Sequence, residues 1–172
     1  MLDLKKCRRV VVKVGSSTLT YETGRLNLRR VEKLARALSD LKNFGREVVL
    51  VTSGAVSTGA ARLGIAERPR DVRMRQAAAA VGQLELLSVY SRFFAEYGHT
   101  VAQLLLTRDV MDVPELKENV RNTFEALLEM GAVPIVNEND TISTFELEHL
   151  MTFGDNDTLA AICAQVIDAD LL

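Results

Sequence analysis

Apolar residues along the chain alternate between short unbroken runs and longer stretches with helical spacing. The runs, rich in Val, Ile and Leu, occupy residues 9–14, 47–52, 100–106 and 132–137. The first two are too uniformly apolar for a strand with one wet face, which predicts strands buried on both faces. Strands that alternate with helices predict right-handed crossovers and an α/β fold, with a mostly parallel sheet covered by helices on both faces.

The stretches between the runs have the start and stop signals of helices. Asn27 is a typical N-cap and Gly45 a typical helix stop. In the longest stretch, Gly82 is expected either to bend the helix or to admit a neighbouring element. Residues 141–153 stay ambiguous between a small hairpin and a mobile flap. The predicted helices span residues 28–44, 55–63, 72–97, 115–130 and 158–167.

Composition narrows the classes of function. The 172 residues include 21 Lys and Arg against 23 Asp and Glu, a net charge of −2, and this balance is not that of a nucleic-acid or anionic-membrane binder. No signal peptide or membrane span is evident, which predicts one soluble, cytoplasmic domain. Two cysteines, Cys7 and Cys163, are too few for a disulfide framework and are expected to be buried free thiols in a reducing compartment.

Polar clusters follow the predicted strands and open the last helix. They occupy residues 13–17, 52–59, 137–141 and 154–158. Ligands of open α/β sheets bind outside the carboxyl ends of the strands, so these clusters predict one shared site.

Lys13 is a cation near the end of an otherwise apolar strand. On its own it would equally fit a side chain that reaches solvent from an edge strand. Followed by Gly15-Ser16-Ser17, it fits a lysine beside backbone N–H groups that can meet phosphate oxygens, although the order is not that of a Walker loop. The turn Ser53-Gly54-Ala55 has small residues between a predicted strand and a predicted helix, which likewise leave backbone N–H groups exposed to an anion. His99 and His149 are interpreted as surface or structural residues.

The last two clusters supply four carboxylates and three amides. Asp155 and Asp157 could bind Mg²⁺, which prefers oxygen ligands and phosphate bridging. A carboxylate pair for sugar hydrolysis is conceivable, but the lysine and the anion-binding turns favour phosphate chemistry.

The chain carries six motifs, at residues 11–17, 49–56, 79–83, 103–108, 136–141 and 153–157. In order and over essentially the whole chain, these motifs resemble the amino acid kinase superfamily. V-T-S-G-A, and N-E-N-D together with G-D-N-D, resemble the branch that phosphorylates glutamate.

This resemblance implies a three-layer αβα sandwich of the carbamate-kinase type and a reaction. The reaction is ATP-dependent phosphorylation of the γ-carboxylate of L-glutamate to γ-glutamyl phosphate, at the start of proline biosynthesis. ATP and Mg²⁺ are the implied cofactors, proline is a possible feedback inhibitor, and a homodimer or homotetramer is expected. Neither nucleic acid nor membrane is an implied partner.

The resemblance also assigns roles to residues. Lys13 would contact the ATP phosphates and stabilise the transferring group, and Asp157 would hold lysines in place. Ser53, Asp140 and Asn156 would bind glutamate. The remaining assignments are Asp155, Asn137 and Gly54 to the substrate and Gly15 and Ser16 to the nucleotide.

The superfamily pattern continues into a second half that holds adenine and ribose and carries another lysine. Residues 1–172 are therefore expected to form the amino-acid-binding part of a kinase domain cut short at its C-terminus, and to be inactive alone. A sister kinase for N-acetylglutamate or aspartate remains an alternative. A non-catalytic glutamate- or proline-binding module is another.

Overall fold

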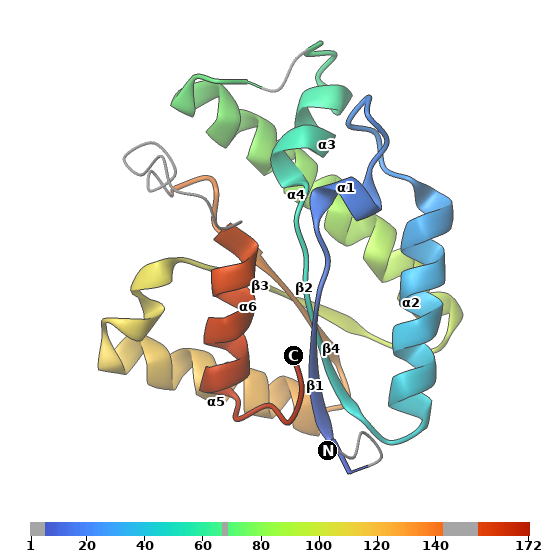
Figure 1. Ribbon diagram of the computed structural model, residues 1–172, viewed down its shortest axis with the longest axis vertical. Helices are drawn as coiled ribbons and strands as arrows, with labels where there is room; N and C mark the ends of the chain where they lie inside the picture. The colour runs from blue at the N-terminus through green and yellow to red at the C-terminus, as the bar shows by residue number, and fades with distance from the viewer. Residues whose placement is uncertain (1–5, 67–68, 143–154) are drawn as a thin grey trace.

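A parallel four-stranded sheet forms the centre of the protein. The computed structural model describes residues 6–66, 69–142 and 155–172. The strand order is β1-β2-β4-β3, and all three neighbouring pairs are parallel, as the alternating pattern predicts (Figure 1). The strands are β1 (Arg9–Lys13), β2 (Glu47–Val51), β3 (Val101–Leu106) and β4 (Val133–Glu138).

The chain returns to this sheet at its last residues. Leu171 pairs in parallel with Val10, on the side of β1 away from β2, and the Val11 N–H donates to the Leu171 carbonyl at 2.9 Å. Leu171 therefore adds a single bridge beside β1 at this edge of the sheet.

Helices cover both faces of the sheet and complete three layers (Figure 1). Alternate residues of β2 point to opposite faces: Val48 and Leu50 pack with α2, α3 and α4, whereas Val49 and Val51 pack with α5 and α6. The helices are α1 (Ser16–Leu19), α2 (Leu28–Asn43), α3 (Ala55–Arg62), α4 (Val72–Glu96), the 3₁₀ turn η1 (Arg108–Met111), α5 (Pro114–Glu129) and α6 (Asp155–Val166).

The predicted start and end of α2 are confirmed. The Asn27 side chain accepts a hydrogen bond from the Arg30 N–H at 3.2 Å, as an N-cap does. Gly45 has a φ of +80°, a left-handed conformation that suits glycine after a helix.

Three elements differ from the sequence prediction. Helix α6 begins at Asp155, three residues before the predicted start at 158, and its first turn includes Asp157, an acidic residue of the kind favoured near a helix N-terminus. The four-residue α1 and the four-residue 3₁₀ turn η1 were not predicted, since both are too short to show a helical period. The hairpin or flap expected at 141–153 falls outside the described residues from 143 onward.

Helices α3 and α4 pack unusually closely through two glycines. A Cβ at Gly59 would lie 1.7 Å from the Ala78 carbonyl oxygen, and one at Gly82 would lie 1.8 Å from the Ala55 carbonyl oxygen. Gly82 therefore admits a neighbouring helix, which was one of its two predicted roles. The contact also sets the position of Ala55, the first residue of α3.

Both cysteines are buried and free, as expected. Burial raises the pKa of the Cys163 thiol to about 12, which keeps it protonated near neutral pH. In the described part of the chain, no helix combines the length and the apolar character that a bilayer crossing requires.

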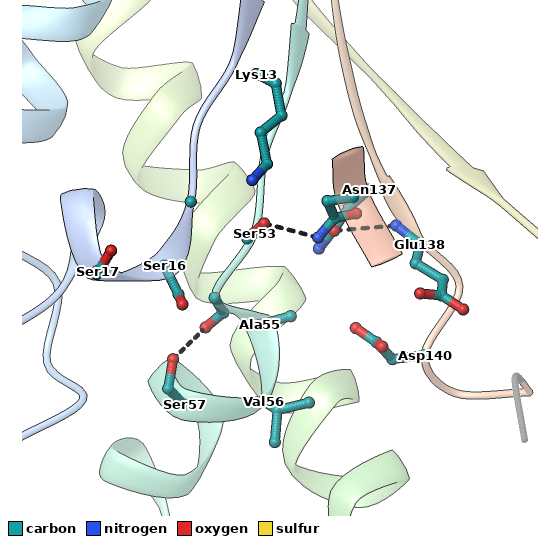
Figure 2. A pocket seen from close by; sticks show the side chains of 13 residues that line it. Lys13, Ser16, Ser17, Ser53, Ala55, Val56, Ser57, Asn137, Glu138 and Asp140 are labelled. Atoms are coloured by element: carbon teal, nitrogen blue, oxygen red, sulfur yellow. Dashed lines mark hydrogen bonds between the residues drawn. The ribbon is translucent and has the colours of Figure 1, made fainter. Parts of the chain in front are cut away.

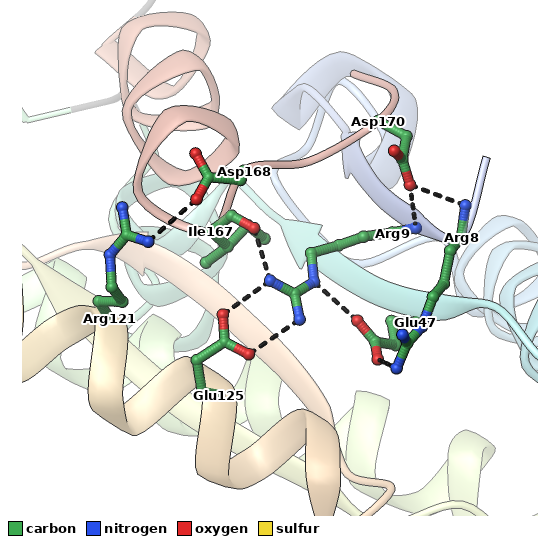
Figure 3. A network of polar contacts seen from close by, with 8 residues as sticks. All are labelled: Arg8, Arg9, Glu47, Arg121, Glu125, Ile167, Asp168 and Asp170. Atoms are coloured by element: carbon green, nitrogen blue, oxygen red, sulfur yellow. Dashed lines mark hydrogen bonds and ion pairs between the residues drawn. The ribbon is translucent and has the colours of Figure 1, made fainter.

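An ionic network connects five segments near the amino ends of the strands (Figure 3). The Arg9 guanidinium donates to both Glu125 carboxylate oxygens, to Glu47 and to the Ile167 carbonyl. The Asp170 carboxylate accepts the N–H groups of Arg8 and Arg9 at 2.7 and 2.8 Å. The network therefore attaches the last residues of the chain to β1.

Candidate active site

The predicted polar clusters converge at the carboxyl edge of the sheet, around a cavity of about 310 Å³. Its walls come from the β1–α1 connection, the β2–α3 turn, the end of β4 and the first turn of α6 (Figure 2). The lining residues are Lys13, Gly15, Ser16, Ser17, Ser53, Gly54, Ala55, Val56, Ser57, Asn137, Glu138, Asp140 and Asn156.

Lys13 supplies the positive charge of the cavity. It is the last residue of β1, and its Nζ lies 2.7 Å from the Asp157 Oδ1 at the start of α6. Its side chain extends toward Ser53, at the end of the neighbouring strand (Figure 2). A Cβ on Gly15 would stand 3.7 Å from the same Nζ, so the loop after β1 passes close to the ammonium group. Asp157 thus holds the Lys13 ammonium group at the cavity, while Asp157 itself lies outside the cavity lining.

The turn between β2 and α3 supplies backbone donors. Gly54 has a φ of +100°, a conformation that favours glycine, and it caps α3 without a side-chain hydrogen bond. The first N–H groups of a helix have no intrahelical partner, and Ala55, Val56 and Ser57 of this first turn line the cavity. The turn therefore suits a carboxylate or phosphate oxygen.

A side-chain contact joins the end of β2 to α6. The Asn156 Nδ2 donates to the Ser53 Oγ at 2.7 Å. The Asn156 Oδ1 is buried and has no hydrogen-bond partner in the described part of the chain. A buried acceptor without a partner costs free energy, so this oxygen is suited to receive an N–H donor.

Two residues of the N-E-N-D motif differ in environment. Asn137 is buried and engaged at both ends, since its Nδ2 donates to the Gln83 Oε1 at 2.7 Å and its Oδ1 accepts the Glu138 N–H at 2.9 Å. Asp140, beyond the end of β4, lines the cavity, and its carboxylate points toward the same space as Lys13 and Ser53 (Figure 2).

The structure brings together nearly all residues singled out from the sequence. Asp157 reaches the cavity through its ion pair with Lys13, and the backbone of Asp155 opens α6. His99 is absent from the cavity lining. The residues singled out from the sequence that line the cavity are Lys13, Gly15, Ser16, Ser53, Gly54, Asn137, Asp140 and Asn156.

Sequence reasoning gave no role to two buried polar residues behind the cavity, Gln83 and Tyr90 of α4, although Gln83 ends the motif at residues 79–83. Gln83 contacts Asn137, and the Tyr90 hydroxyl lies 2.9 Å from the Thr52 Oγ1. Burial raises the pKa of Tyr90, which stays a neutral hydrogen-bonding group. Both residues lie on the apolar side of the helix, and a polar residue on such a face was the available signal.

The chain is similar in sequence to one family of known proteins. The model of the amino acid kinase family matches residues 8–172. The glutamate 5-kinase of Listeria innocua is 56% identical over 170 residues, which are 99% of this chain and 62% of the relative. That of Clostridium perfringens is 54% identical over 169 residues, 98% of this chain and 63% of the relative. That of Enterococcus faecalis is 51% identical, with 98% and 62% covered.

The chain thus spans somewhat less than two thirds of the length of these relatives. The family model, which matches residues 8–172, spans every segment that lines the cavity. Because the family model matches all but the first seven residues, the chain belongs to the amino acid kinase family.

Proposed function

We propose that the whole protein is a glutamate 5-kinase, which transfers the γ-phosphoryl group of ATP to the γ-carboxylate of L-glutamate in the first step of proline biosynthesis. The observation that carries the proposal is the placement of Lys13, Ser53, Asp140 and Asn156 around one cavity, in a chain 51–56% identical to proteins of that name.

The proposed step needs positioning and charge stabilisation rather than a strong base. A γ-carboxylate oxygen attacks the γ-phosphorus, the bond from that phosphorus to the β,γ-bridging oxygen breaks, and ADP leaves with the electron pair. The nucleophile is already ionised at neutral pH, because the pKa of a glutamate carboxyl is about 4.3. Among the described residues that line the cavity there are a cation and backbone donors but no His or Cys, and this set suits such chemistry.

Lys13 has the central role in this proposal. Its ammonium, held by Asp157 at 2.7 Å, contacts the ATP phosphates and stabilises the charge that spreads over the transferring group. Gly15 and Ser16, beside it in the cavity wall, contact the nucleotide phosphates.

The substrate end of the cavity is assigned by charge. Asp140 pairs with the α-ammonium, and Ser53, Asn156 and the turn at Gly54 hold carboxylate oxygens or the ammonium by hydrogen bonds. The Asn156 Oδ1, buried without a partner in the described structure, is the natural acceptor for one ammonium proton.

Two further residues complete the assignment. Asn137 supports the wall through its buried contacts, and we include it in the substrate site on that ground. Asp155 is proposed as an additional substrate contact from its place at the start of α6.

Mg²⁺ enters the proposal only as the companion of the ATP phosphates. Among the described residues, no three His, Cys, Asp or Glu side chains gather into a metal-binding group. Magnesium commonly takes one or two carboxylates plus substrate phosphates, so the ion would accompany the nucleotide. Inhibition by proline, a homodimeric or homotetrameric assembly and a cytoplasmic location belong to the same proposal.

The decisive experiment compares acceptors with the whole protein. ADP release is measured with L-glutamate, N-acetyl-L-glutamate and L-aspartate, and hydroxylamine traps the acyl phosphate as a hydroxamate. We expect kcat/KM for L-glutamate to exceed that for N-acetyl-L-glutamate on the order of 10²-fold or more, because the acetyl group removes the charge that Asp140 pairs with. A preference for N-acetyl-L-glutamate or L-aspartate would assign the protein to a sister kinase. Binding of glutamate without ADP release would favour a non-catalytic module.

A further inference from the structure

Gln83 lies behind the cavity and outside its lining, yet it contacts a residue of the site. It belongs to α4, is 7% exposed, and its Oε1 accepts a hydrogen bond from the Asn137 Nδ2 at 2.7 Å. The two residues are 54 positions apart in sequence, so the contact forms only when α4 packs on the end of β4. Polar side chains at this depth are kept when their hydrogen bonds are satisfied.

The orientation of these two amides follows from their neighbours. The Glu138 backbone N–H can only donate, and it donates to the Asn137 Oδ1 at 2.9 Å. The Asn137 Nδ2 must therefore face Gln83, and Gln83 must present its oxygen. Asn137 thus bridges the two groups: its Nδ2 donates to Gln83 on α4, and its Oδ1 holds the Glu138 amide.

This chain of contacts ends at the segment that carries Asp140. The Glu138 amide is held by the Asn137 side chain, and the Asn139 N–H donates to the Leu106 carbonyl at 2.8 Å. Asp140 follows directly and lines the cavity. Of these two anchors, the first depends on a side chain and the second on backbone pairing with β3.

We propose that Gln83 is a positioning residue, which orients Asn137 and through it the backbone at Glu138, so that Asp140 is held in place for the ammonium group of the substrate. The role assigned to the ammonium rests on the proposed function. The contacts from Gln83 to Glu138 do not depend on it.

The relay predicts a local effect that a general loss of stability would not produce. Gln83→Met keeps the length of the side chain but removes its acceptor, which frees Asn137 to rotate away from the Glu138 amide. We expect hydrogen exchange of the Glu138 amide to accelerate about tenfold, the equivalent of one ordinary hydrogen bond. Exchange of the Asn139 amide is expected to stay within about twofold, because its partner is the Leu106 carbonyl.

Two further variants separate the relay from packing. Gln83→Glu keeps an oxygen acceptor and is expected to retain the exchange rate of the wild-type Glu138 amide. Tyr97→Phe removes a hydrogen bond to Glu32 at the far end of α4. It is expected to leave both amides unchanged, whatever it does to the melting temperature. If Gln83→Met does not fold, Gln83→Glu in comparison with Tyr97→Phe still tests whether the acceptor alone preserves the Glu138 bond.

Kinetics of the whole protein test the consequence for the site. Gln83→Met is expected to raise the KM for L-glutamate several-fold, up to about tenfold, with the KM for ATP within about twofold. Gln83→Glu should restore the wild-type KM. An unchanged Glu138 exchange rate in Gln83→Met, or equal increases in both KM values, would overturn the relay. If the wild-type protein does not phosphorylate glutamate, the proposed function fails, and the exchange rates alone decide the role of Gln83.

Discussion

Lys13 carries the charge on which the proposed phosphoryl transfer depends. In the whole protein, Lys13→Ala is expected to lower kcat on the order of 10²–10³-fold, as the loss of a transition-state charge stabiliser does. The KM for L-glutamate should change little, since the cation interacts most strongly as charge redistributes during transfer. Steady-state ADP release at saturating ATP measures both.

A matched control for this variant is Lys42→Ala. Lys42 is also half-buried, and its Nζ donates to the Gly131 carbonyl at 2.7 Å, but it lies near the amino end of the sheet. Its removal should leave kcat unchanged. If Lys13→Ala kept wild-type turnover, Lys13 would be only an edge-strand lysine that extends to solvent.

Asp140 tests the substrate end of the cavity. Asp140→Asn removes the negative charge with almost no change of shape. Hydrogen bonds to charged groups contribute about 1.5–3 kcal/mol, so the KM for L-glutamate should rise on the order of 10–100-fold. The KM for ATP should stay close to that of wild type. The control is Asp40→Asn, which changes an exposed aspartate of α2 and should leave the KM values for L-glutamate and ATP unchanged. Equal effects of Asp140→Asn on both substrates would place this residue elsewhere in the reaction.

At the scale of elements, the close contact between α3 and α4 opposes helix propensity. Replacing a mid-helix glycine by alanine ordinarily stabilises a helix by up to about 1 kcal/mol. A Cβ at Gly82 would instead lie 1.8 Å from the Ala55 carbonyl oxygen, so the helices must separate. We expect Gly82→Ala to lower the free energy of unfolding by about 2–3 kcal/mol, the upper part of the usual range for overpacking.

The same variant should also weaken the site, because Ala55 begins the helix that lines the cavity. Ala80→Gly, at an exposed position two residues away on the same helix, provides the comparison and is expected to cost about 1 kcal/mol through propensity alone. Urea denaturation of the three proteins measures these differences. A Gly82→Ala protein more stable than wild type would show that the two helices tolerate separation.

At the scale of the whole molecule, the ionic network predicts acid sensitivity. Hydrogen bonds from the Arg9 and Arg8 backbone N–H groups lower the pKa of Asp170. Burial raises the pKa of Glu47, but the hydrogen bonds and charges of Arg9 and Arg8 outweigh it, and the net shift is also downward. A carboxyl with a lowered folded-state pKa stabilises the fold above its unfolded pKa, and the contribution disappears as the pH falls through the folded value.

In the unfolded chain, the pKa values of Asp and Glu side chains are about 3.9 and 4.3. The stabilisation should therefore be complete above about pH 5 and decrease below about pH 4. Denaturation with urea at a series of pH values from 7 to 3 measures this profile. Asp170→Asn should flatten the acid limb, because the carboxylate that holds Arg8 and Arg9 is absent at every pH. If the variant lost stability at low pH as the wild type does, Asp170 would not contribute to the pH dependence.

Much of the local structure could be predicted from periodicity and end signals. The four strands and five long helices appear within a few residues of their expected bounds, apart from the three extra residues at the start of α6. The edge where the site lies was also predictable, since polar residues after parallel strands meet at one edge. The family resemblance implied that Asp157 holds a lysine, but position along the chain did not, because 144 residues separate Asp157 from Lys13. Nor could it reveal that Asn156 contacts Ser53, 103 residues away.

The sequence by itself determined the α/β class, the parallel sheet and the residue types at its carboxyl edge. These depend on hydrophobic spacing and turn chemistry, which act over a few neighbouring residues. The tertiary structure alone decided that β4 lies between β2 and β3, that Gly59 and Gly82 bring α3 against α4, and that Gln83 contacts Asn137. The reason is physical: such contacts depend on how whole elements pack, and a pair of distant residues has no local signal until the helices and strands that carry them have come together.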